Sequence, residues 1–260
     1  MLRGEAVRDC VERVQDAESV VFLLDYDGTL VPIRSRPEMA APDPEILQLL
    51  ERLSARPGFE VHVVSGRERT SFESWLGALS IVLHAEHGLW SRDPETREWI
   101  MNATVSTDWK PRVRAVLDDV AKSAPRSFVE EKTAGLAWHY RQVDPDFGLS
   151  KAKELRLLLF ELLSNLPVQV IAGDRVVEVR CQGVNKGLVV DRVLRAGPAG
   201  RLVVAMGDDR TDEDLFAALP DGAITLHVGP GQSRAAYRLA DPYAARSFLR
   251  ALVEQGQPER

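Results

Sequence analysis

Two aspartates directly after an apolar run are the first residues in this sequence whose types and spacing suit chemistry. Residues 20–24 (VVFLL) are uninterrupted and apolar, and the polar run DYDGT follows at once, so that Asp25 and Asp27 lie two positions apart. Carboxylates at the end of a buried strand need a cation or hydrogen bonds to remain charged. An Asp-x-Asp pair also occurs in turns and on solvated surfaces, and alone it indicates catalysis only weakly.

A second acidic cluster lies far away in the chain. Residues 207–214 read GDDRTDED, which places four Asp and one Glu in the seven positions after the glycine. So many like charges repel one another unless some of them hold a metal, and hard oxygen ligands with few competing His or Cys favour Mg²⁺. Thr211 or Asp212 is also expected to cap the helix that follows.

Two further residues complete a candidate phosphate site. Ser65 lies beside Gly66 after the apolar run 61–64 and can donate a hydrogen bond to a phosphate oxygen, although alone it is more often a turn residue. Lys186 follows the segment GVN at the expected start of a helix, where its ammonium and the helix N-terminus could face one anion. A single lysine there is usually exposed to solvent, so its weight comes from the other three segments.

The elements that must position these residues alternate along the chain. The runs 20–24, 61–64 and 202–206 are rich in Val and Leu without alternation, as in strands that are buried on both faces of a parallel sheet. Amphipathic patterns predict helices at 44–55, 186–196 and 211–219. This order indicates an α/β fold, in which a site forms at the carboxyl ends of the strands.

The middle of the chain follows a different pattern. It predicts a helix at 110–122, strands at 127–131 and 135–140, a helix at 150–164, and a hairpin of strands at 168–172 and 176–180. We therefore expect an inserted α+β domain at 109–181, within a core made of residues 1–108 and 182–260. A further helix is expected near 5–17, and it either packs on the core or serves an interface.

The length, composition, net charge and cysteine content limit the classes of function that suit this sequence. A 260-residue chain of ordinary composition with a net charge of −6 argues against a general binder of nucleic acid or membrane surfaces. An anionic substrate would then need a bound cation and focused Lys and Arg residues. Only two cysteines are present, Cys10 and Cys181, and neither lies in a metal-binding or redox pattern, so a reduced cytoplasmic setting is expected. No signal peptide or membrane span is predicted.

Together the four polar segments resemble the ordered motifs of haloacid-dehalogenase (HAD) phosphatases. The resemblance covers the core and rests on DYDGTL at 25–30, on Ser65-Gly66-Arg67, on Lys186, and on GDDRTD at 207–212. It implies a Rossmann-like core with a parallel sheet and an acyl-phosphate mechanism.

The inserted segment narrows this resemblance to trehalose-6-phosphate phosphatases. The matching stretches are EEK at 130–132, LAWHYR at 136–141, VEVR at 177–180 and GVNKG at 183–187. In that family the insertion is a cap that closes over the sugar, and Glu130, Lys132, Arg141 and Glu178 match the residues that hold its hydroxyls. One departure is Cys181, where the family often has proline, and it bears on the stiffness of the domain junction.

His139 is ambiguous in this sequence. Strand alternation places it opposite Tyr140, and a packed structural histidine suits the position at least as well as a ligand does.

The resemblance implies a set of roles. Asp25 is the nucleophile and a Mg²⁺ ligand, together with Asp208 and the backbone carbonyl of Asp27. Asp27 is also the general acid and then the base, for which its pKa would be raised in the closed site. Ser65 and Lys186 neutralise the phosphate, and Arg67 is counted with the substrate-binding residues. Asp209 and Asp212 are expected to support the ligands or their waters.

Other functions remain open. The same chemistry on sucrose 6-phosphate or a mannosyl-glycerate phosphate is the nearest alternative to a phosphorylated disaccharide of trehalose type. A regulatory module without activity is another, and a functional coupling to a separate trehalose-6-phosphate synthase is compatible with enzyme activity.

Overall fold

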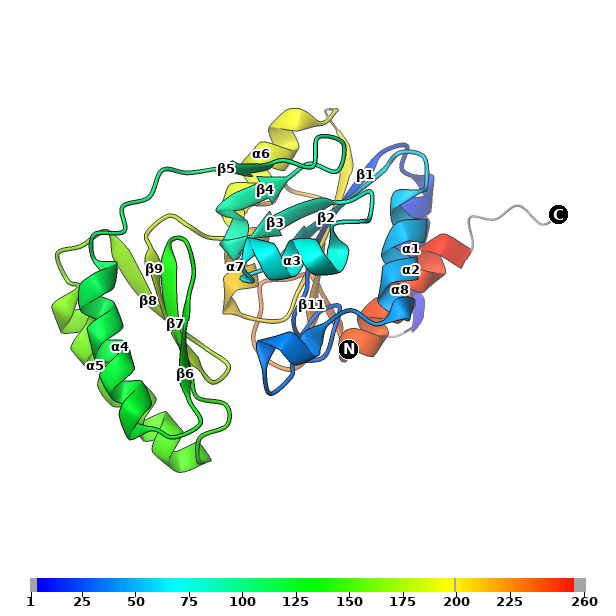
Figure 1. The fold of residues 1–260 in the computed structure, drawn as a ribbon. Coiled ribbons are helices and arrows are strands. Elements are labelled where there is room, and N and C mark those ends of the chain that lie inside the picture. Colours follow the sequence, from blue (N-terminus) through cyan, green and yellow to red (C-terminus); the bar gives the residue numbers. More distant parts are fainter. Residues whose placement is uncertain (1–3, 199, 255–260) are drawn as a thin grey trace. The chain divides into compact units, whose positions relative to one another are not determined.

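The computed structural model describes residues 4–198 and 200–254, and they form two compact units (Figure 1). Unit 1 comprises residues 1–102 and 185–260, and unit 2 comprises residues 103–184. The boundaries expected from the sequence, after residues 108 and 181, lie six and three residues from these. The function of unit 2 as a cap stays a prediction.

Unit 1 is an eight-stranded sheet in the order β12-β11-β10-β1-β2-β3-β4-β5. Neighbours pair in parallel from β12 to β3, whereas β3, β4 and β5 pair in antiparallel. The strands are β1 (Val20–Asp25), β2 (Phe59–Val64), β3 (Val82–Ala85), β4 (Trp90–Arg92), β5 (Trp99–Met101), β10 (Leu202–Gly207), β11 (Ile224–Val228) and β12 (Tyr237–Leu239). The helices are α1 (Gly4–Asp16), α2 (Pro44–Ser54), α3 (Arg69–Leu76), α6 (Gly187–Ala196), α7 (Arg210–Ala218) and α8 (Pro242–Glu254), with short 3₁₀ turns η1 (Pro37–Ala40) and η2 (Glu86–Gly88).

Helices cover both faces of this sheet, and β1 shows why its sequence does not alternate. Phe22 and Leu24 pack in one apolar cluster with residues of α1, α2 and α8, whereas Val21 and Leu23 pack in another with α6 and α7. Figure 1 shows α1, α2 and α8 on the same side of the sheet, where α8 contacts both α1 and α2. A strand that is buried on both faces must be apolar at every position, so the α/β fold expected from the sequence is confirmed.

Several elements of unit 1 were not expected from the sequence. They are α3, β3, β4, β5, β11, β12 and α8. The strands β4, β5 and β12 have three residues each, which is too short for a periodic pattern to appear, and they are stabilised by pairing with sheet neighbours.

Unit 2 is a four-stranded antiparallel sheet in the order β6-β7-β9-β8, with two helices on one face (Figure 1). Its elements are α4 (Lys110–Ser123), β6 (Phe128–Glu131), β7 (Gly135–His139), α5 (Pro145–Leu162), β8 (Val168–Gly173) and β9 (Val176–Cys181). Leu136, Trp138, Val177 and Val179 are buried and alternate with residues of the opposite face. The order of elements predicted for the insertion is therefore correct.

Helix α5 begins five residues before its predicted start at 150. Asp144 is the N-cap, and its side chain accepts a hydrogen bond from Phe147 N at 3.0 Å. Pro145 occupies the first helical position, where its missing N–H costs nothing. The cap and the proline together start the helix early.

Two further features concern the helices and the cysteines. No helix within the described ranges 4–198 and 200–254 is long and apolar enough to cross a membrane. Cys10 and Cys181 are both free thiols and both buried.

A core substitution in α2 should measure the packing of unit 1. Leu50 is fully buried against the sheet, so Leu50→Ala is expected to lower the free energy of unfolding by about 2–5 kcal/mol through lost transfer energy and an unfilled cavity. Urea denaturation followed by tryptophan fluorescence measures the change. Gln48→Ala on the exposed side of the same helix is the control, and an equal loss there would contradict the assigned packing.

Candidate functional site

The polar segments found in the sequence meet at one edge of the sheet in unit 1. Asp25 is the last residue of β1, Ser65 follows β2, and Asp208 follows β10. The three strands are neighbours in the order β10-β1-β2 and run parallel. Their carboxyl ends therefore carry these side chains to the same place, as the sequence predicted.

A buried lysine holds two of the acids together. Lys186 Nζ donates to Asp25 Oδ1 at 2.5 Å and to Asp212 Oδ1 at 2.7 Å. The exposed fractions of the Lys186, Asp25 and Asp212 side chains are 2%, 6% and 0%. Burial opposes the charge of Lys186, but Asp212 and Asp25 outweigh it and raise the lysine pKa. The ammonium is therefore firmly charged, and it is not the exposed lysine that the alternative interpretation proposed.

The carboxylates outnumber the positive charge that the protein supplies. Burial raises the pKa of Asp25 even though Lys186 opposes the shift, and burial followed by repulsion from Asp25, Asp209 and Asp212 raises the pKa of Asp208 to about 10. Burial likewise raises the pKa of Asp212 well above its usual value. The buried acids around one ammonium therefore carry an excess of negative charge that a bound cation would balance.

The donor set fits a divalent cation. One oxygen from each of Asp25, Asp208 and Asp212 lies within 4.8 Å of the others. In the part of the chain that the structure describes, Asp25 Oδ2 is buried and has no hydrogen-bond partner. Hard oxygen ligands that carry an excess of negative charge suit an ion such as Mg²⁺ or Ca²⁺.

Two glycines allow the segments to approach so closely. Gly28 has φ +84°, and a Cβ at this position would lie 2.0 Å from Asp208 Oδ2. A Cβ at Gly207 would lie 2.1 Å from Asp212 Cγ. Any side chain at either position would push an acid out of the cluster. Steric overlap therefore explains why both motifs have glycine at these positions.

The cap of helix α7 differs in part from the expectation. Asp209 is the N-cap, and its Oδ1 accepts hydrogen bonds from the backbone and the hydroxyl of Thr211, each at 2.7 Å. Asp212 is the N3 residue of the capping box, and its Oδ2 accepts from the backbone N–H of Asp208 and of Asp209. The prediction that Thr211 or Asp212 caps the helix was correct in part. Asp212 belongs to the capping box, whereas the N-cap residue is Asp209 and not Thr211.

Asp27 lies apart from the three grouped carboxylates and pairs with Arg67. The guanidinium donates to both carboxylate oxygens of Asp27, at 2.7 and 2.6 Å, and lies over the ring of Trp75 at 4.5 Å. Bidentate pairs of this kind are strong and geometrically specific. Arg67, which was predicted to bind substrate, is engaged with Asp27 in this structure.

The Ser65–Arg67 segment is held by a turn that the sequence analysis missed. Ser65 N donates to His84 O, His87 N donates to Ser65 O, and Glu86 N donates to Arg67 O, at 2.8–2.9 Å. Glu86 and His87 are buried and have φ of +49° and +58°, which is rare outside glycine. The signal in the sequence was a pair of polar residues before Gly88, directly after a strand.

In unit 2, three of the four predicted sugar-binding residues share one sheet face. Glu130 of β6 and Glu178 of β9 both lie opposite Ala137 of β7, so their side chains share one face of the sheet. Lys132 Nζ donates to Glu178 Oε1 at 2.9 Å. Burial opposes ionisation of Glu130, but Lys132 and His139 outweigh it and lower its pKa. Arg141 lies outside this face, in the connection after β7, and pairs with Asp174 of the β8–β9 turn at 2.8 Å.

His139 belongs to the same face as Glu130. Its Nε2 lies 2.7 Å from Glu130 Oε2, and its ring stacks on Phe128 with centroids 4.7 Å apart. The sequence left His139 open between packing and ligand, and the structure makes it a partner of a predicted site residue.

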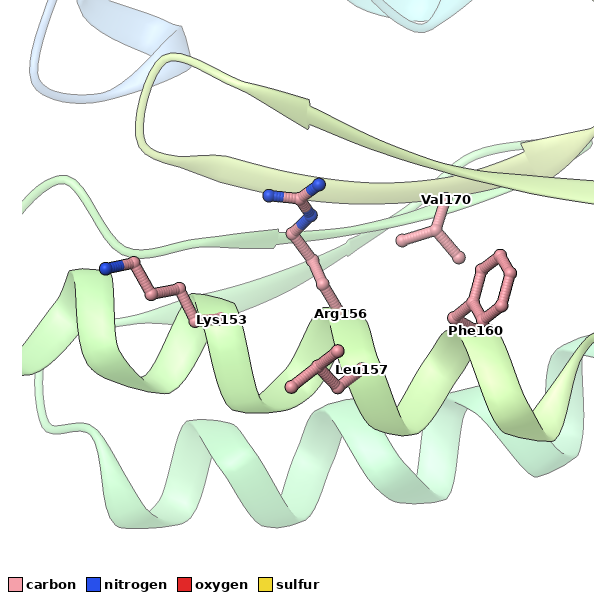
Figure 2. A pocket seen from close by; sticks show the side chains of 5 residues that line it. All are labelled: Lys153, Arg156, Leu157, Phe160 and Val170. Atoms are coloured by element: carbon pink, nitrogen blue, oxygen red, sulfur yellow. The ribbon is translucent and has the colours of Figure 1, made fainter.

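A groove in unit 2 lies away from these charged residues. Figure 2 shows its lining, with Lys153, Arg156, Leu157 and Phe160 from α5 and Val170 from β8. Its volume is about 400 Å³, and none of the residues predicted to act chemically lines it. We therefore do not assign the candidate site to this groove.

Comparison with known proteins adds a family to this geometry. The family model described as trehalose-phosphatase matches residues 23–242. The chain belongs to the trehalose-phosphatase family. A curated relative from Thermoproteus tenax, named a bifunctional trehalose-6-phosphate synthase/phosphatase, is 41% identical over 236 residues, which is 91% of this chain and 32% of the relative. The chain thus spans about a third of the length of that relative.

Solved structures agree with the family and with the fold. The C-terminal domain of Candida albicans trehalose-6-phosphate phosphatase is 29% identical, with a TM-score of 0.89 over 95% of this chain and 96% of that domain. A HAD-like hydrolase from Bacteroides thetaiotaomicron has a TM-score of 0.63 over 89% of this chain and 99% of its own, at 16% identity. The similarity to the Bacteroides thetaiotaomicron protein concerns only the fold, which is HAD-like.

Removal of the buried lysine should test the charge balance of this site. Lys186→Met leaves Asp25 and Asp212 buried without their cation, so the free energy of unfolding should fall by about 3–5 kcal/mol when measured by urea denaturation with a chelator. Lys151→Met is the control. Lys151 pairs with Glu154 and lies over the Phe147 ring near the surface, so its loss should change stability by less than ~1 kcal/mol. Equal stability of the two variants would show that the buried pairs contribute nothing.

Proposed function

We propose that this chain is a Mg²⁺-dependent phosphatase that converts trehalose 6-phosphate and water into trehalose and inorganic phosphate. The family match and the names of the relatives support a trehalose phosphatase. The observation that carries the chemistry is Asp25, which has one oxygen bound by Lys186 and a second, buried oxygen with no hydrogen-bond partner among the described residues.

The second oxygen of Asp25 is the proposed nucleophile. Asp25 Oδ2 attacks phosphorus, the bond from phosphorus to the sugar oxygen breaks, and an aspartyl-phosphate forms. Lys186 orients the carboxylate and offsets the repulsion between two anions. Ser65 Oγ accepts from Arg67 N at 3.2 Å, so its own hydroxyl proton is available for a phosphate oxygen.

The cation site uses the acids at the strand ends. Asp25, Asp208 and the backbone carbonyl of Asp27 are the proposed Mg²⁺ ligands, and Asp209 and Asp212 hold them in place through the cap of α7. Bound Mg²⁺ would neutralise charge on the transferring phosphoryl group. Asp212 has a second role, because it shares Lys186 with the nucleophile.

Asp27 is the proposed proton donor and later the base. A proton from Asp27 goes to the leaving sugar oxygen, and the resulting carboxylate then takes a proton from the water that hydrolyses the aspartyl-phosphate. Arg67 occupies both oxygens of Asp27 in this structure. We propose that the substrate phosphate attracts Arg67 and frees Asp27 for proton transfer.

Unit 2 is the proposed cap, and its sheet face opposite α4 and α5 is the proposed sugar-binding surface. Glu130, Lys132 and Glu178 present acceptors and donors side by side, as recognition of sugar hydroxyls requires. Arg141, which follows β7 and pairs with Asp174, would add to this set. Because helices cover the other face, only this face can offer its polar groups to a ligand.

A coupling to trehalose-6-phosphate synthase is part of the proposal. The relative from Thermoproteus tenax carries both activities in its name, and this chain matches about a third of it. We propose that the phosphorylated disaccharide reaches this chain from a separate synthase.

Phosphate release from a panel of sugar phosphates tests the activity. Release from trehalose 6-phosphate should require Mg²⁺, and Asp25→Asn should reduce kcat at least about 10³-fold because the amide is not a nucleophile. Asp146→Asn, at an exposed carboxylate of α5, is the matched control. Equal release from glucose 6-phosphate, sucrose 6-phosphate and a mannosyl-glycerate phosphate would overturn the trehalose assignment and leave the phosphatase. No release from any of them would overturn both.

Neutralising one member of the sheet-face pair tests sugar recognition. Lys132→Met should raise KM for trehalose 6-phosphate about 10- to 100-fold, which corresponds to the loss of one charged hydrogen bond of ~1.5–3 kcal/mol. The Kd for inorganic phosphate, measured by calorimetry, should stay unchanged because phosphate does not reach the sugar contacts. Lys122→Met, at an exposed pair on α4, is the control. A KM equal to that of the control would remove Lys132 from the sugar site.

A further inference from the structure

A buried chain of hydrogen bonds crosses unit 1 beside the candidate site. It starts at Glu60 and passes through two histidines of neighbouring strands: His62 Nε2 lies 2.7 Å from Glu60 Oε1, and His62 Nδ1 lies 2.8 Å from His84 Nε2. It continues from His84 Nδ1 to Ser91 Oγ at 2.7 Å and ends at Asn102, whose Nδ2 lies 2.6 Å from the same hydroxyl. His62, His84 and Ser91 are at most 4% exposed.

The direction of every hydrogen bond in this chain follows from its two ends. Interactions with His62 and Arg201 lower the pKa of Glu60 to about 2, so its carboxylate only accepts, and His62 Nε2 must donate to it. In a neutral His62, Nδ1 then accepts from His84 Nε2, and His84 Nδ1 accepts the proton of Ser91. The Ser91 oxygen in turn accepts from the Asn102 amide.

At Asn102, the chain of hydrogen bonds holds the turn at residues 86–88, which contacts the segment Ser65–Arg67. Asn102 Nδ2 also donates to Gly88 O at 2.7 Å, and Arg192 fixes the amide by donating to Asn102 Oδ1 at 3.0 Å. Gly88 follows Glu86 and His87, so three successive residues have φ of +49°, +58° and +88°. Such a conformation persists only where surrounding contacts enforce it.

The same turn is in direct contact with the motif at 65–67. Three backbone hydrogen bonds join residues 84–87 to Ser65 and Arg67, and a Cβ at Gly66 would lie 2.7 Å from the His87 ring. Displacement of the turn would therefore move both the hydroxyl of Ser65 and the guanidinium of Arg67.

We propose that His62 and His84 are positioning residues, which hold the phosphate-binding segment Ser65–Arg67 in its working conformation only while both imidazoles are neutral. The inference rests on the proposed function for the role of that segment. Neither histidine contacts the substrate, and each acts through Ser91, Asn102 and the turn at 86–88.

This chain of hydrogen bonds cannot accommodate an additional proton. On His62 Nδ1 it would either face the N–H of His84 across 2.8 Å or reverse the chain, so that His84 donates to Ser91 and the buried Ser91 proton loses its acceptor. Either result weakens the bond network that holds Asn102.

The charges around the two rings come from three elements and leave the neutral forms favoured. Burial lowers the pKa of His62 although Glu60 of β2 opposes the shift, and Arg201 and Arg192 add to the lowering. Burial, and then His62 and Arg192 of α6, lower the pKa of His84 well below its usual value. The unfolded chain binds these protons near pH ~6.5, so the arrangement is fully stable above that pH and is lost as pH falls towards the lowered native values.

Steady-state kinetics between about pH 5 and 8 separate positioning from general structure. In the wild type, KM should be constant near neutral pH. It should rise, with kcat changing less, only as pH falls towards the native pKa of His62, which burial lowers from its usual value. His84→Gln keeps a donor towards His62 and cannot be protonated, and its amide can rotate to accept from a protonated His62. We expect its KM to be raised about threefold to tenfold at pH ~7.5, because Ser91 loses its acceptor, and to change little with pH.

The control uses another buried histidine of the same sheet. His227 on β11 is 3% exposed, and its ring contacts Pro230 O. His227→Asn should retain the wild-type profile, and titration of the substrate phosphate is common to all variants. A His84→Gln profile that is parallel to the wild type, with equal KM, would overturn the proposal.

Two measurements keep the inference separate from the proposed activity. Long-range ¹H–¹⁵N NMR of the imidazoles should show the Nε2–H tautomer for both His62 and His84, and an Nδ1–H tautomer for either would contradict the chain. If no sugar phosphate is hydrolysed, the Kd of inorganic phosphate replaces KM in the same variants. Asn102→Ala, which removes both donors to Ser91 and Gly88, should then weaken phosphate binding about threefold to tenfold if His84→Gln fails to fold. Unchanged binding in Asn102→Ala would overturn the positioning role.

Discussion

The buried ammonium of Lys186 is the interaction on which the site in unit 1 depends. It lies between Asp25 and Asp212 with almost no exposure, and it is the one protein cation in direct contact with those acids among the described side chains. Its single charge cannot balance the carboxylates around it, which explains why burial and mutual repulsion raise the pKa of Asp208 and Asp212. The excess negative charge makes the cluster receptive to a divalent cation. The same lysine leaves one oxygen of Asp25 available for reaction.

The sheet brings this cluster together, and glycines let it close. Strands β10, β1 and β2 are parallel neighbours, so the residues after them meet although they are separated by long stretches of chain. Close approach of Asp208 and Asp212 to the other segments depends on Gly28 and Gly207, because a Cβ at either position would overlap a carboxylate. The apolar faces of β1 pack against helices on both sides, which makes the strand ends a rigid support for the acids.

Unit 2 follows the same physical rule with different chemistry. Its sheet is covered by helices on one face, and the opposite face carries the pairs Lys132–Glu178 and His139–Glu130. Acids and bases held side by side remain hydrogen-bonded before a ligand arrives, so a sugar would exchange one set of polar contacts for another. The family relation links this arrangement to proteins named trehalose-6-phosphate phosphatase. Phosphate chemistry and sugar recognition can be tested separately, with variants in unit 1 and in unit 2.

Much of this protein was determined by the sequence itself. The DYDGT, GDDRTD and Ser65-Gly66-Arg67 segments, the α/β class and the order of elements in the insertion follow from local signals: apolar runs, caps and turn residues. Tertiary structure alone decided the rest. That Asp27 pairs with Arg67 apart from the other acids, that Arg141 pairs with Asp174, and that His139 contacts Glu130 all depend on strand register and on contacts between residues distant in the sequence. The short strands β4 and β5, and the left-handed turn at 86–88, have no local pattern of their own, because only the hydrogen bonds of neighbouring segments stabilise them.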